Sequence, residues 1–445
     1  MPGTPRTSPA ASRFIYRLAR VALLCAAFVG APRALPGQQR RLPDSLTDRE
    51  FWQFFTGMSE PSGRFPSENF VSNEKTYQYV IPFLQRTLTP NGVYLGVGPE
   101  QNFTYLVNFK PRMAVIFDIR RQNAMTHLMY KALFEIAESR TEFVARLFSR
   151  PLPAMSISAT PAEIFAAVAT APASDSAFTV TWNAIVARLT RTHGFALSDA
   201  DLESMRHVFS AFHEGGPNIS YAYHIGAPPT ATPWLVTFAE LQSLGNADGT
   251  NMAFLASEEN YRWLRTLESR NMVVPVVGDF AGPTAIRAVG DYLKQHGATV
   301  TAFYVSNVEQ YLFDGFGANE RFYRNVETLP VDMTSAFIRS LPAGSTLAAL
   351  PVGLPAPNSA KYTLQVSDSG GVRVWTATST DSAGRSVVTR VVTTLPPITV
   401  ANTSAFVSGT ASITGVLDAF AKGQLKTYVQ VTAATKIDGW GVPPQ

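Results

Sequence analysis

The sequence predicts an α/β fold built on a doubly wound, mostly parallel sheet, with a helical insertion and a C-terminal β-rich segment. Only 16% of the 445 residues are charged and 46% are hydrophobic, so the chain can bury a large core. Continuous apolar runs alternate with helical patterns, as expected of strands that are buried on both faces of a parallel sheet. The predicted strands are residues 92–97, 112–118, 272–279 and 298–307.

Apolar residues at helical spacing predict helices before and after these strands. Residues 281–297 give the clearest example, because Pro283 stands near the start of the pattern and Gly297 at its end. Strands that alternate with helices in this way favour the connections of a doubly wound sheet. The other predicted helices are residues 44–58, 72–88, 103–109, 121–138, 307–313 and 319–329.

The main α/β domain is predicted to span residues 44–342 with a helical insertion inside it, and two further segments follow it. Residues 141–271 lack a strand pattern and contain several helical stretches, so we expect a helical insertion there. Residues 343–410 are rich in Ser and Thr and alternate apolar with polar positions, which predicts a β-rich hairpin segment. Residues 411–445 are predicted to add a helix and then a strand, KTYVQVTAA, that complete the α/β domain.

The N-terminus has the pattern of an export signal. Arginines precede an apolar stretch of 11 residues, 21–31, which suits a signal peptide and is short for a membrane-spanning helix of about 20 residues. We expect a signal peptide over residues 1–37 and export to the periplasm or the extracellular space. The alternative is an uncleaved N-terminal segment that anchors the protein to a membrane. Cys25, the single cysteine, lies inside this stretch, so the mature chain would have no disulfide or thiolate metal site.

The charge of the mature chain gives no reason to expect nucleic-acid binding. Removal of residues 1–37 takes away five arginines and no acidic residue, so the formal net charge falls from +4 to −1. A near-neutral chain lacks the basic surface that binds phosphate backbones. No later run is long and apolar enough to predict a membrane span in the mature chain, and the sequence identifies no protein partner.

Glycines and polar residues follow each predicted strand, at the edge of the sheet where ligands of doubly wound proteins bind. A Gly-x-Gly turn follows the first strand, and its glycines permit a tight bend and a close approach of the backbone to a ligand. The second strand ends in an acid 22 residues after the first glycine, a spacing typical of carboxylates that bind ribose hydroxyls. The candidate site residues are Gly96, Gly98 and Glu100 in the first turn, Asp118 at the end of the second strand, Asp279 at the end of the third, and Ser306 and Asn307 at the end of the fourth.

These strand ends resemble those of the class I S-adenosylmethionine-dependent methyltransferase superfamily, and the run is similar to an uncharacterised bacterial branch of it. The resemblance covers roughly residues 72–140 and 271–340. It implies a Rossmann-like fold, S-adenosylmethionine as the cofactor and methyl transfer as the activity. The implied roles are contact with the methionine and ribose for Gly96, Gly98 and Glu100, binding of the ribose hydroxyls for Asp118, contact with the adenine or the sulfonium for Asp279, and the acceptor position for Asn307 with Ser306.

Some features depart from the superfamily pattern. Glu100 stands where many members have a third glycine, and no Asn/Asp-Pro-Pro-Tyr/Phe tetrad follows the fourth strand, so an amino-methylating mechanism is unsupported. The same residues also have structural explanations, since glycines form turns and Asp118, Asp279 and Asn307 could cap helices. The histidines show no metal-ligand spacing, and no Gly-x-Ser-x-Gly elbow occurs, so neither a metal site nor a serine hydrolase is predicted.

Two functions therefore remain open from the sequence. The first is a methyltransferase-like protein that binds S-adenosylmethionine or a related small-molecule nucleoside, with an unknown methyl acceptor. The second is a non-catalytic exported binding protein on a degenerate methyltransferase scaffold. The export signal favours the second function, because S-adenosylmethionine is made in the cytoplasm and an exported enzyme has no obvious supply of it.

Overall fold

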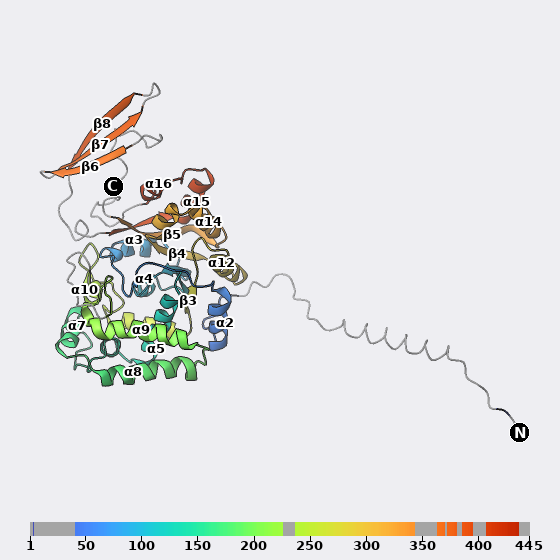
Figure 1. Cartoon of the computed structure of the whole chain (residues 1–445), viewed down its shortest axis with the longest axis vertical. Helices are drawn as coiled ribbons and strands as arrows, with labels where there is room; N and C mark the ends of the chain where they lie inside the picture. The colour runs from blue at the N-terminus through green and yellow to red at the C-terminus, as the bar shows by residue number, and fades with distance from the viewer. Residues whose placement is uncertain are drawn as a thin grey trace. The chain divides into compact units, whose positions relative to one another are not determined.

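The computed structural model describes residues 3, 41–225, 236–342, 363–369, 372–380, 385–394 and 406–435 (Figure 1). The chain divides into two units, residues 1–40 and 41–445, and every helix and strand named below belongs to the second unit. Apart from residue 3, the predicted signal peptide lies outside the described residues, as does Cys25. Among the described residues, no helix combines the length and the apolar character needed to cross a membrane.

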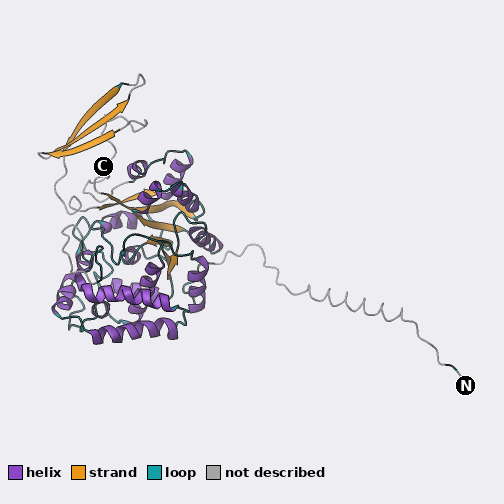
Figure 2. Ribbon diagram, viewed as in Figure 1, coloured by secondary structure: helices purple, strands orange, loops and turns teal. Residues whose placement is uncertain are grey.

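A six-stranded, mostly parallel sheet lies among the helices of the larger unit, with the strand order β3-β2-β1-β4-β5-β9 (Figure 2). Neighbours from β3 to β5 are parallel, and β9 pairs with β5 in the antiparallel direction. The chain is therefore a mixed α/β protein, which confirms that part of the predicted fold class. The strands are β1 (Val93–Val97), β2 (Met113–Asp118), β3 (Val273–Val277), β4 (Val300–Ser306), β5 (Val331–Pro342) and β9 (Phe406–Ser412).

The strands β1 to β4 fall where the sequence predicts them because their sequences are continuous apolar runs. Every residue of β2 and β3 is buried, as the interior of a parallel sheet requires. In the register of the sheet, Leu95 of β1 pairs with Val115 of β2 on one side and with Phe303 of β4 on the other. These pairs join the strand ends into one edge of the sheet.

Helices connect the strands. Between β2 and β3 the described residues contain helices and, apart from one bridge between Ser220 and Thr237, no strand pairing, which agrees with the predicted helical insertion. The helices of this connection are α5 (Arg121–Ile136), α6 (Arg140–Leu147), α7 (Pro161–Thr170), α8 (Asp175–Ala187), η2 (Arg188–Thr192), α9 (Asp199–Gly215), η3 (Gly216–Asn218), α10 (Phe238–Ser243) and α11 (Glu258–Ser269).

Helices from both sides of the connection between β2 and β3 pack against the sheet and against one another. Helix α11 packs with α4 and with α5, and α5 contacts β2 and β3. Helix α2 packs against β3 and α12. Helix α15 packs against β5. The helices outside the connection from β2 to β3 are α2 (Asp48–Met58), η1 (Tyr77–Val80), α3 (Ile81–Thr87), α4 (Gln101–Phe109), α12 (Ala285–Gln295), α13 (Val308–Asp314), α14 (Ala318–Val326), α15 (Ile413–Ala421) and α16 (Tyr428–Ala433).

Capping boxes determine where several helices begin. Thr47, Thr160, Ser198 and Thr237 each accept a hydrogen bond from the backbone of the third helical residue, whose acidic side chain binds back to the cap. Each box satisfies backbone N–H groups that the first helical turn leaves without partners. These starts follow from local sequence alone.

The predicted β-rich segment contains a three-stranded antiparallel sheet of β6 (Thr363–Ser369), β7 (Val372–Thr380) and β8 (Ser386–Thr394). Its strands are neighbours in both sequence and space, which is the pattern of a meander. The segment stands between β5 and β9, and Pro342 at the end of β5 is the register partner of Phe406 at the start of β9. Residues 343–405 are therefore inserted at the tip of a hairpin of the main sheet.

The C-terminal part differs from the prediction in two respects. Residues 406–412, which were assigned mostly to the β-rich segment, form β9 of the main sheet. The predicted last strand is wrong, because Tyr428–Ala433 is the helix α16. Thr427 and Gln430 form a capping box at its start, so local hydrogen bonding outweighs the β-branched and aromatic residues that suggested a strand.

Strand β5 was not predicted, because polar residues interrupt its apolar pattern. Arg339 in the middle of β5 is fully buried, and its Nε lies 2.5 Å from a carboxylate oxygen of Glu309. The hydroxyl of Tyr323 also donates to Glu309, at 2.7 Å. A buried charge requires such a partner, and sequence periodicity carries no information about it.

Candidate functional site

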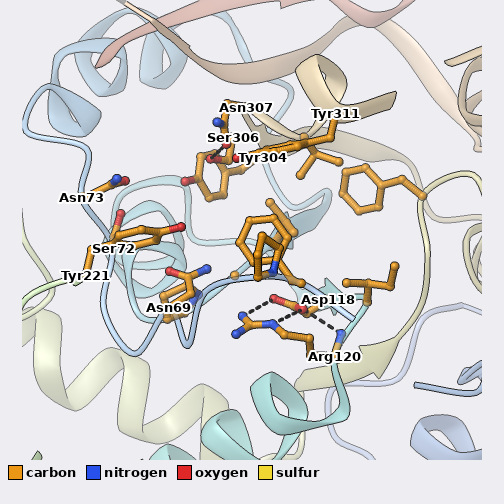
Figure 3. Close-up of a pocket in the computed structure, with 18 of the residues that line it drawn as sticks. Asn69, Ser72, Asn73, Asp118, Arg120, Tyr221, Tyr304, Ser306, Asn307 and Tyr311 are labelled. Carbon is orange, nitrogen blue, oxygen red and sulfur yellow. Dashed lines mark hydrogen bonds and ion pairs between the residues drawn. The ribbon is translucent and has the colours of Figure 1, made fainter. Parts of the chain in front are cut away.

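A cavity of about 780 Å³ lies at the carboxyl ends of β1, β2, β3 and β4. This volume is within the usual range for a small-molecule site. Strands β1 and β4 are neighbours in the sheet although far apart in sequence, so the order reverses between them, and ligands of open α/β sheets bind at such a reversal. Figure 3 shows Asp118 and Arg120 at one end of the cavity and Ser306 and Asn307 at the other.

Five of the seven predicted site residues line this cavity, and two do not. The lining residues are Gly98, Asp118, Asp279, Ser306 and Asn307. Gly96 and Glu100 lie behind the wall instead. The structure therefore brings together one residue or more from each of the four strand ends.

The packing of the protein interior, and not contact with a ligand, explains the glycine at position 96. A Cβ atom at this position would lie 2.0 Å from Oδ1 of Asn102. The Nδ2 group of Asn102 donates to the carbonyl oxygens of Val97, Gly98 and Pro99, at 3.0, 3.2 and 2.7 Å. Gly96 thus makes room for the side chain that holds the turn.

Glu100 is fully buried at the start of α4. One oxygen, Oε1, accepts the backbone N–H of Ser72 at 3.1 Å, and Oε2 has no hydrogen-bond partner among the described residues. Burial raises the pKa of Glu100 to about 7, although the hydrogen bond from Ser72 acts in the opposite direction. Glu100 therefore supports the wall that carries Ser72 and does not reach the cavity itself.

Gly98 has the conformation that the sequence predicts for a tight turn. Its φ is +75°, and the nearest atom to an added Cβ is Nδ2 of Asn69 at 3.9 Å, so open space lies above it. Its carbonyl oxygen accepts hydrogen bonds from Asn102 and Asn123 at 3.2 Å each and is 2.9 Å from Nε2 of His127. Burial lowers the pKa of His127 to about 4, so its ring is neutral and Nε2–H acts as the donor.

Asp118 forms a buried ion pair that the sequence patterns did not predict. Arg120 donates to it from Nε at 3.2 Å, from its terminal nitrogen at 3.1 Å, and from its backbone N–H at 2.8 Å. Oδ1 receives two of these bonds, whereas Oδ2 receives one and keeps one lone pair for a further donor. An arginine two residues after an acid at a strand end is the sequence signal that could have revealed this pair.

Asp279 lines the cavity and also organises the start of α12. Its Oδ1 accepts the backbone N–H of Ala281 at 2.9 Å. Its own N–H donates to Glu60 at 3.1 Å, and Glu60 also accepts from the backbone of Thr284 and Ala285 at 2.7 and 2.9 Å. Burial opposes ionisation of Glu60, but these hydrogen bonds outweigh it and lower its pKa. Asp279 therefore has a structural role in addition to its place at the cavity.

Ser306 and Asn307 end β4 beside a buried acid, Glu74, which the sequence patterns did not identify. The hydroxyls of Ser306 and Tyr304 donate to Oε1 of Glu74 at 2.6 and 2.7 Å, and Nε2 of Gln101 donates to Oε2 at 2.8 Å. Ser306 has a φ of +51°, which a residue other than glycine adopts only where its surroundings hold it. Burial raises the pKa of Glu74, although hydrogen bonds from Ser306, Gln101 and Tyr304 and the hydroxyl of Ser340 act in the opposite direction.

Residues 59–76, here called the crossing segment, contact the strand ends one after another in the order of the sheet. The N–H of Glu60 donates to Val277 of β3 at 2.8 Å, and the N–H of Gly63 donates to Ile119, just after β2, at 2.7 Å. Ser72 binds Glu100 after β1, and Glu74 binds Ser306 of β4. The crossing segment therefore closes one side of the cavity.

Aromatic side chains supply much of the apolar lining of the cavity. Planar rings of this kind can pack against a base or another flat group of a ligand. Figure 3 shows Tyr221 on the same side of the cavity as Ser72, and Tyr311 on the side of Tyr304. The aromatic lining residues are Phe65, Tyr221, Phe280, Tyr304, Tyr311 and Phe406.

The part of the chain that the structure describes contains no group of three or more His, Cys, Asp or Glu side chains placed to hold a metal ion. Two of the ionisable groups at the cavity, Asp118 and Arg120, form an ion pair with each other.

Comparison with known proteins relates the chain to one family. Among curated proteins, none matches the sequence. Residues 69–195 and 235–396 match a family described as a domain of unknown function, DUF7790. The matched ranges cover more than half of the chain and include all seven predicted site residues as well as Glu74 and Arg120. The chain therefore belongs to the DUF7790 family.

Proposed function

We propose that the cavity binds a nucleoside-type small molecule, with S-adenosylmethionine as the leading candidate, and that the protein is methyltransferase-like. The observation that carries the proposal is the convergence of Gly98, Asp118, Asp279, Ser306 and Asn307 around one cavity. The strand order 3-2-1-4-5 is that of doubly wound nucleotide-binding sheets, which supports the finer description of the fold as methyltransferase-like.

The residues of the cavity fit such a ligand in several respects. The remaining lone pair of Asp118 Oδ2 can accept one ribose hydroxyl, and the open space above Gly98 lets a ligand approach the backbone. The aromatic lining suits an adenine ring. When bound, S-adenosylmethionine would supply an electrophilic methyl group on a sulfonium. This chain would hold both reactants in line and exclude water from them.

Calorimetric titration with S-adenosylmethionine and S-adenosylhomocysteine tests the proposal. We expect saturable heat in the micromolar range, and the variant Asp118→Asn should weaken binding by roughly tenfold or more because it removes a charged hydrogen-bond acceptor. The matched control is Asp44→Asn, since Asp44 also pairs with an arginine, Arg112, at 2.9 Å but is exposed and does not line the cavity. No heat at millimolar ligand with the wild-type protein would reject the proposal.

The second candidate, a non-catalytic exported binding protein on the same scaffold, is favoured by one observation. Asp118 gives most of its hydrogen-bonding capacity to Arg120, and Gly96 and Glu100 serve the interior of the protein. A site adapted away from S-adenosylmethionine would have these features. Tight binding of a nucleoside without the methionine part, such as adenosine, together with no binding of S-adenosylmethionine, would support this second function.

A further inference from the structure

Glu74 is a buried acid at the cavity that, unlike Asp118 and Glu309, has no positive partner; Glu100 also lacks one but does not line the cavity. Its side chain lines the cavity and is only 3% exposed. Asp118 pairs with Arg120, and Glu309 pairs with Arg339. Among the described residues no Lys, Arg or His comes within ion-pair distance of Glu74, whose contacts are hydroxyl and amide donors.

The ionisable groups that surround Glu74 add no positive charge. They are another carboxyl and four tyrosine hydroxyls, contributed by β1, α4, β4 and α16: Glu100, Tyr94, Tyr105, Tyr304 and Tyr428. A buried carboxylate without a counter-charge is unfavourable, so burial raises the pKa of Glu74, and a cation that approaches it would stabilise the ionised form. The cavity is the open side from which a cation could come.

The geometry at the end of β4 fixes where such a cation would lie. The hydroxyls of Ser306 and Tyr304 both donate to Oε1 and Gln101 donates to Oε2, so these donors orient the carboxyl group. The hydroxyl of Ser340 on β5 also acts on this carboxyl group and lowers its pKa. Figure 3 places Ser306 at the opposite end of the cavity from Asp118. A nucleoside whose ribose lies at Asp118 would therefore direct its 5′ substituent toward Glu74.

We propose that Glu74 is a specificity-determining residue that selects ligands with a cationic group at the Ser306 end of the cavity. This inference rests on the proposed nucleoside site and adds the chemical class of the group that the ligand carries on its 5′ substituent, an ammonium or a sulfonium. When the cation binds, the carboxylate of Glu74 pairs with it, and the proton held by protonated Glu74 passes to solvent.

Two closely similar ligands test the proposal. Sinefungin carries a primary ammonium group where the sulfonium and its methyl group stand in S-adenosylmethionine, and S-adenosylhomocysteine has a neutral thioether there. The two ligands share the α-ammonium and carboxylate of their amino-acid part, so they differ in charge only at the sulfonium position. We expect the wild-type protein to bind sinefungin roughly tenfold more tightly than S-adenosylhomocysteine, because only sinefungin places a cation at that position for Glu74. Titrations in two buffers with different ionisation enthalpies should show proton release with sinefungin and none with S-adenosylhomocysteine.

The variant Glu74→Gln keeps the size and hydrogen-bonding capacity of the side chain and removes its charge. It should bind S-adenosylhomocysteine within about threefold of the wild-type value, lose the preference for sinefungin and release no proton. The exposed Glu259, on α11, provides the control Glu259→Gln, which should retain both the preference and the proton release. A purely structural role of Glu74 would weaken both ligands equally and leave the ratio unchanged.

The outcomes separate this inference from the proposed function. If neither ligand binds the wild-type protein, the nucleoside site and the inference both fail. If both bind with equal affinity and without proton release, the nucleoside site stands and the role of Glu74 is rejected. The wild-type ratio and proton count give this answer even if Glu74→Gln does not fold.

Discussion

At the scale of single residues, burial determines the chemistry of the acids around the cavity. Glu74 follows Ser72 in the crossing segment, Glu100 accepts the N–H of Ser72, and burial raises the pKa values of both acids. Glu60 lies nearer to solvent and collects backbone N–H groups, so its pKa is lowered. Glutamates around one cavity therefore have pKa values shifted in opposite directions, which favours the neutral form of Glu74 and Glu100 and the ionised form of Glu60.

Glu100→Gln should change how the stability of the protein depends on pH. The pKa of Glu100 is about 7 in the folded protein and 4.5 is the ordinary value, so the folded state holds its proton more tightly than the unfolded state. This group therefore destabilises the protein progressively as pH rises from 4.5 to 7, by up to roughly 1 kcal/mol for each pH unit. The variant lacks this contribution.

Urea unfolding of both proteins between pH 5 and pH 8 measures the effect. We expect the variant to gain stability relative to the wild type as pH increases and to show little gain at pH 5. A difference that is the same at every pH would contradict the assignment of the proton to Glu100.

Gly98→Ala should be destabilising because of the backbone and not because of space. The φ of +75° costs a residue with a Cβ about 1 kcal/mol or more, although no atom lies closer than 3.9 Å to the added group. Gly57→Ala is the matched control, because Gly57 lies in α2 with nothing within 4 Å of its added Cβ, and there alanine should stabilise by about 0.5–1 kcal/mol. Opposite signs in urea unfolding are expected, and equal effects would contradict the prediction.

At the scale of elements, helix α12 shows a cap that comes from far away in the sequence. Thr284, its N-cap residue, makes no side-chain capping bond, and the carboxylate of Glu60 accepts the N–H groups of Thr284 and Ala285 instead. An anion at a helix N-terminus also interacts favourably with the helix dipole. The crossing segment therefore supplies the charge that begins this helix.

Glu60→Ala should destabilise the protein by about 1–3 kcal/mol, because it leaves the N–H groups at the start of α12 without an acceptor. The difference in the free energy of unfolding between the wild type and the variant should decrease as the pH falls through the lowered pKa of Glu60, because only the carboxylate accepts all of these hydrogen bonds. Unfolding in urea at pH 7 and pH 3 measures both effects. The exposed Glu259 is again the control, and a loss of stability as large in Glu259→Ala would contradict the prediction.

The difference between predicted and unpredicted elements has a physical cause. Strands β1 to β4 and their polar ends were predicted because apolar runs and the residues that follow them are local features of the sequence. Glu74, Arg120 and Glu60 were not predicted as parts of the site, because their positions depend on contacts across the chain. Arg120, for example, donates to the carbonyl oxygens of Ser67 and Glu68, at 2.9 and 2.6 Å, which no periodicity specifies.

At the scale of the whole molecule, the β-rich insertion is separable from the main sheet by topology. Pro342 and Phe406 are register partners, so the hairpin of β5 and β9 can be closed directly between them. The strands β6, β7 and β8 pair only with one another among the described strands. The main sheet therefore does not depend on the inserted strands for its hydrogen bonds.

Replacement of residues 343–405 by an Asn-Gly turn should leave the remaining protein folded, with a melting temperature within about 5 °C of the full chain. Thermal unfolding followed by circular dichroism measures this, and the nucleoside titrations above show whether the cavity is retained. A control deletion that also removes β9 should be strongly destabilising, because Ser408 of β9 donates from its N–H to Thr76 at 2.9 Å and β5 would lose its antiparallel neighbour. Similar stability for the two deletions would contradict the prediction.

The crossing segment couples the motions of the four strand ends. It forms hydrogen bonds at the ends of β3, β2, β1 and β4 in turn. We therefore expect that breaking the hydrogen bonds at one strand end weakens those at the next. An occupant that immobilises this stretch would slow amide hydrogen exchange at Glu60, Gly63 and Ser72 together, including at amides that lie beyond its own reach. Exchange at these three backbone positions would thus report occupancy by a molecule of any chemical class.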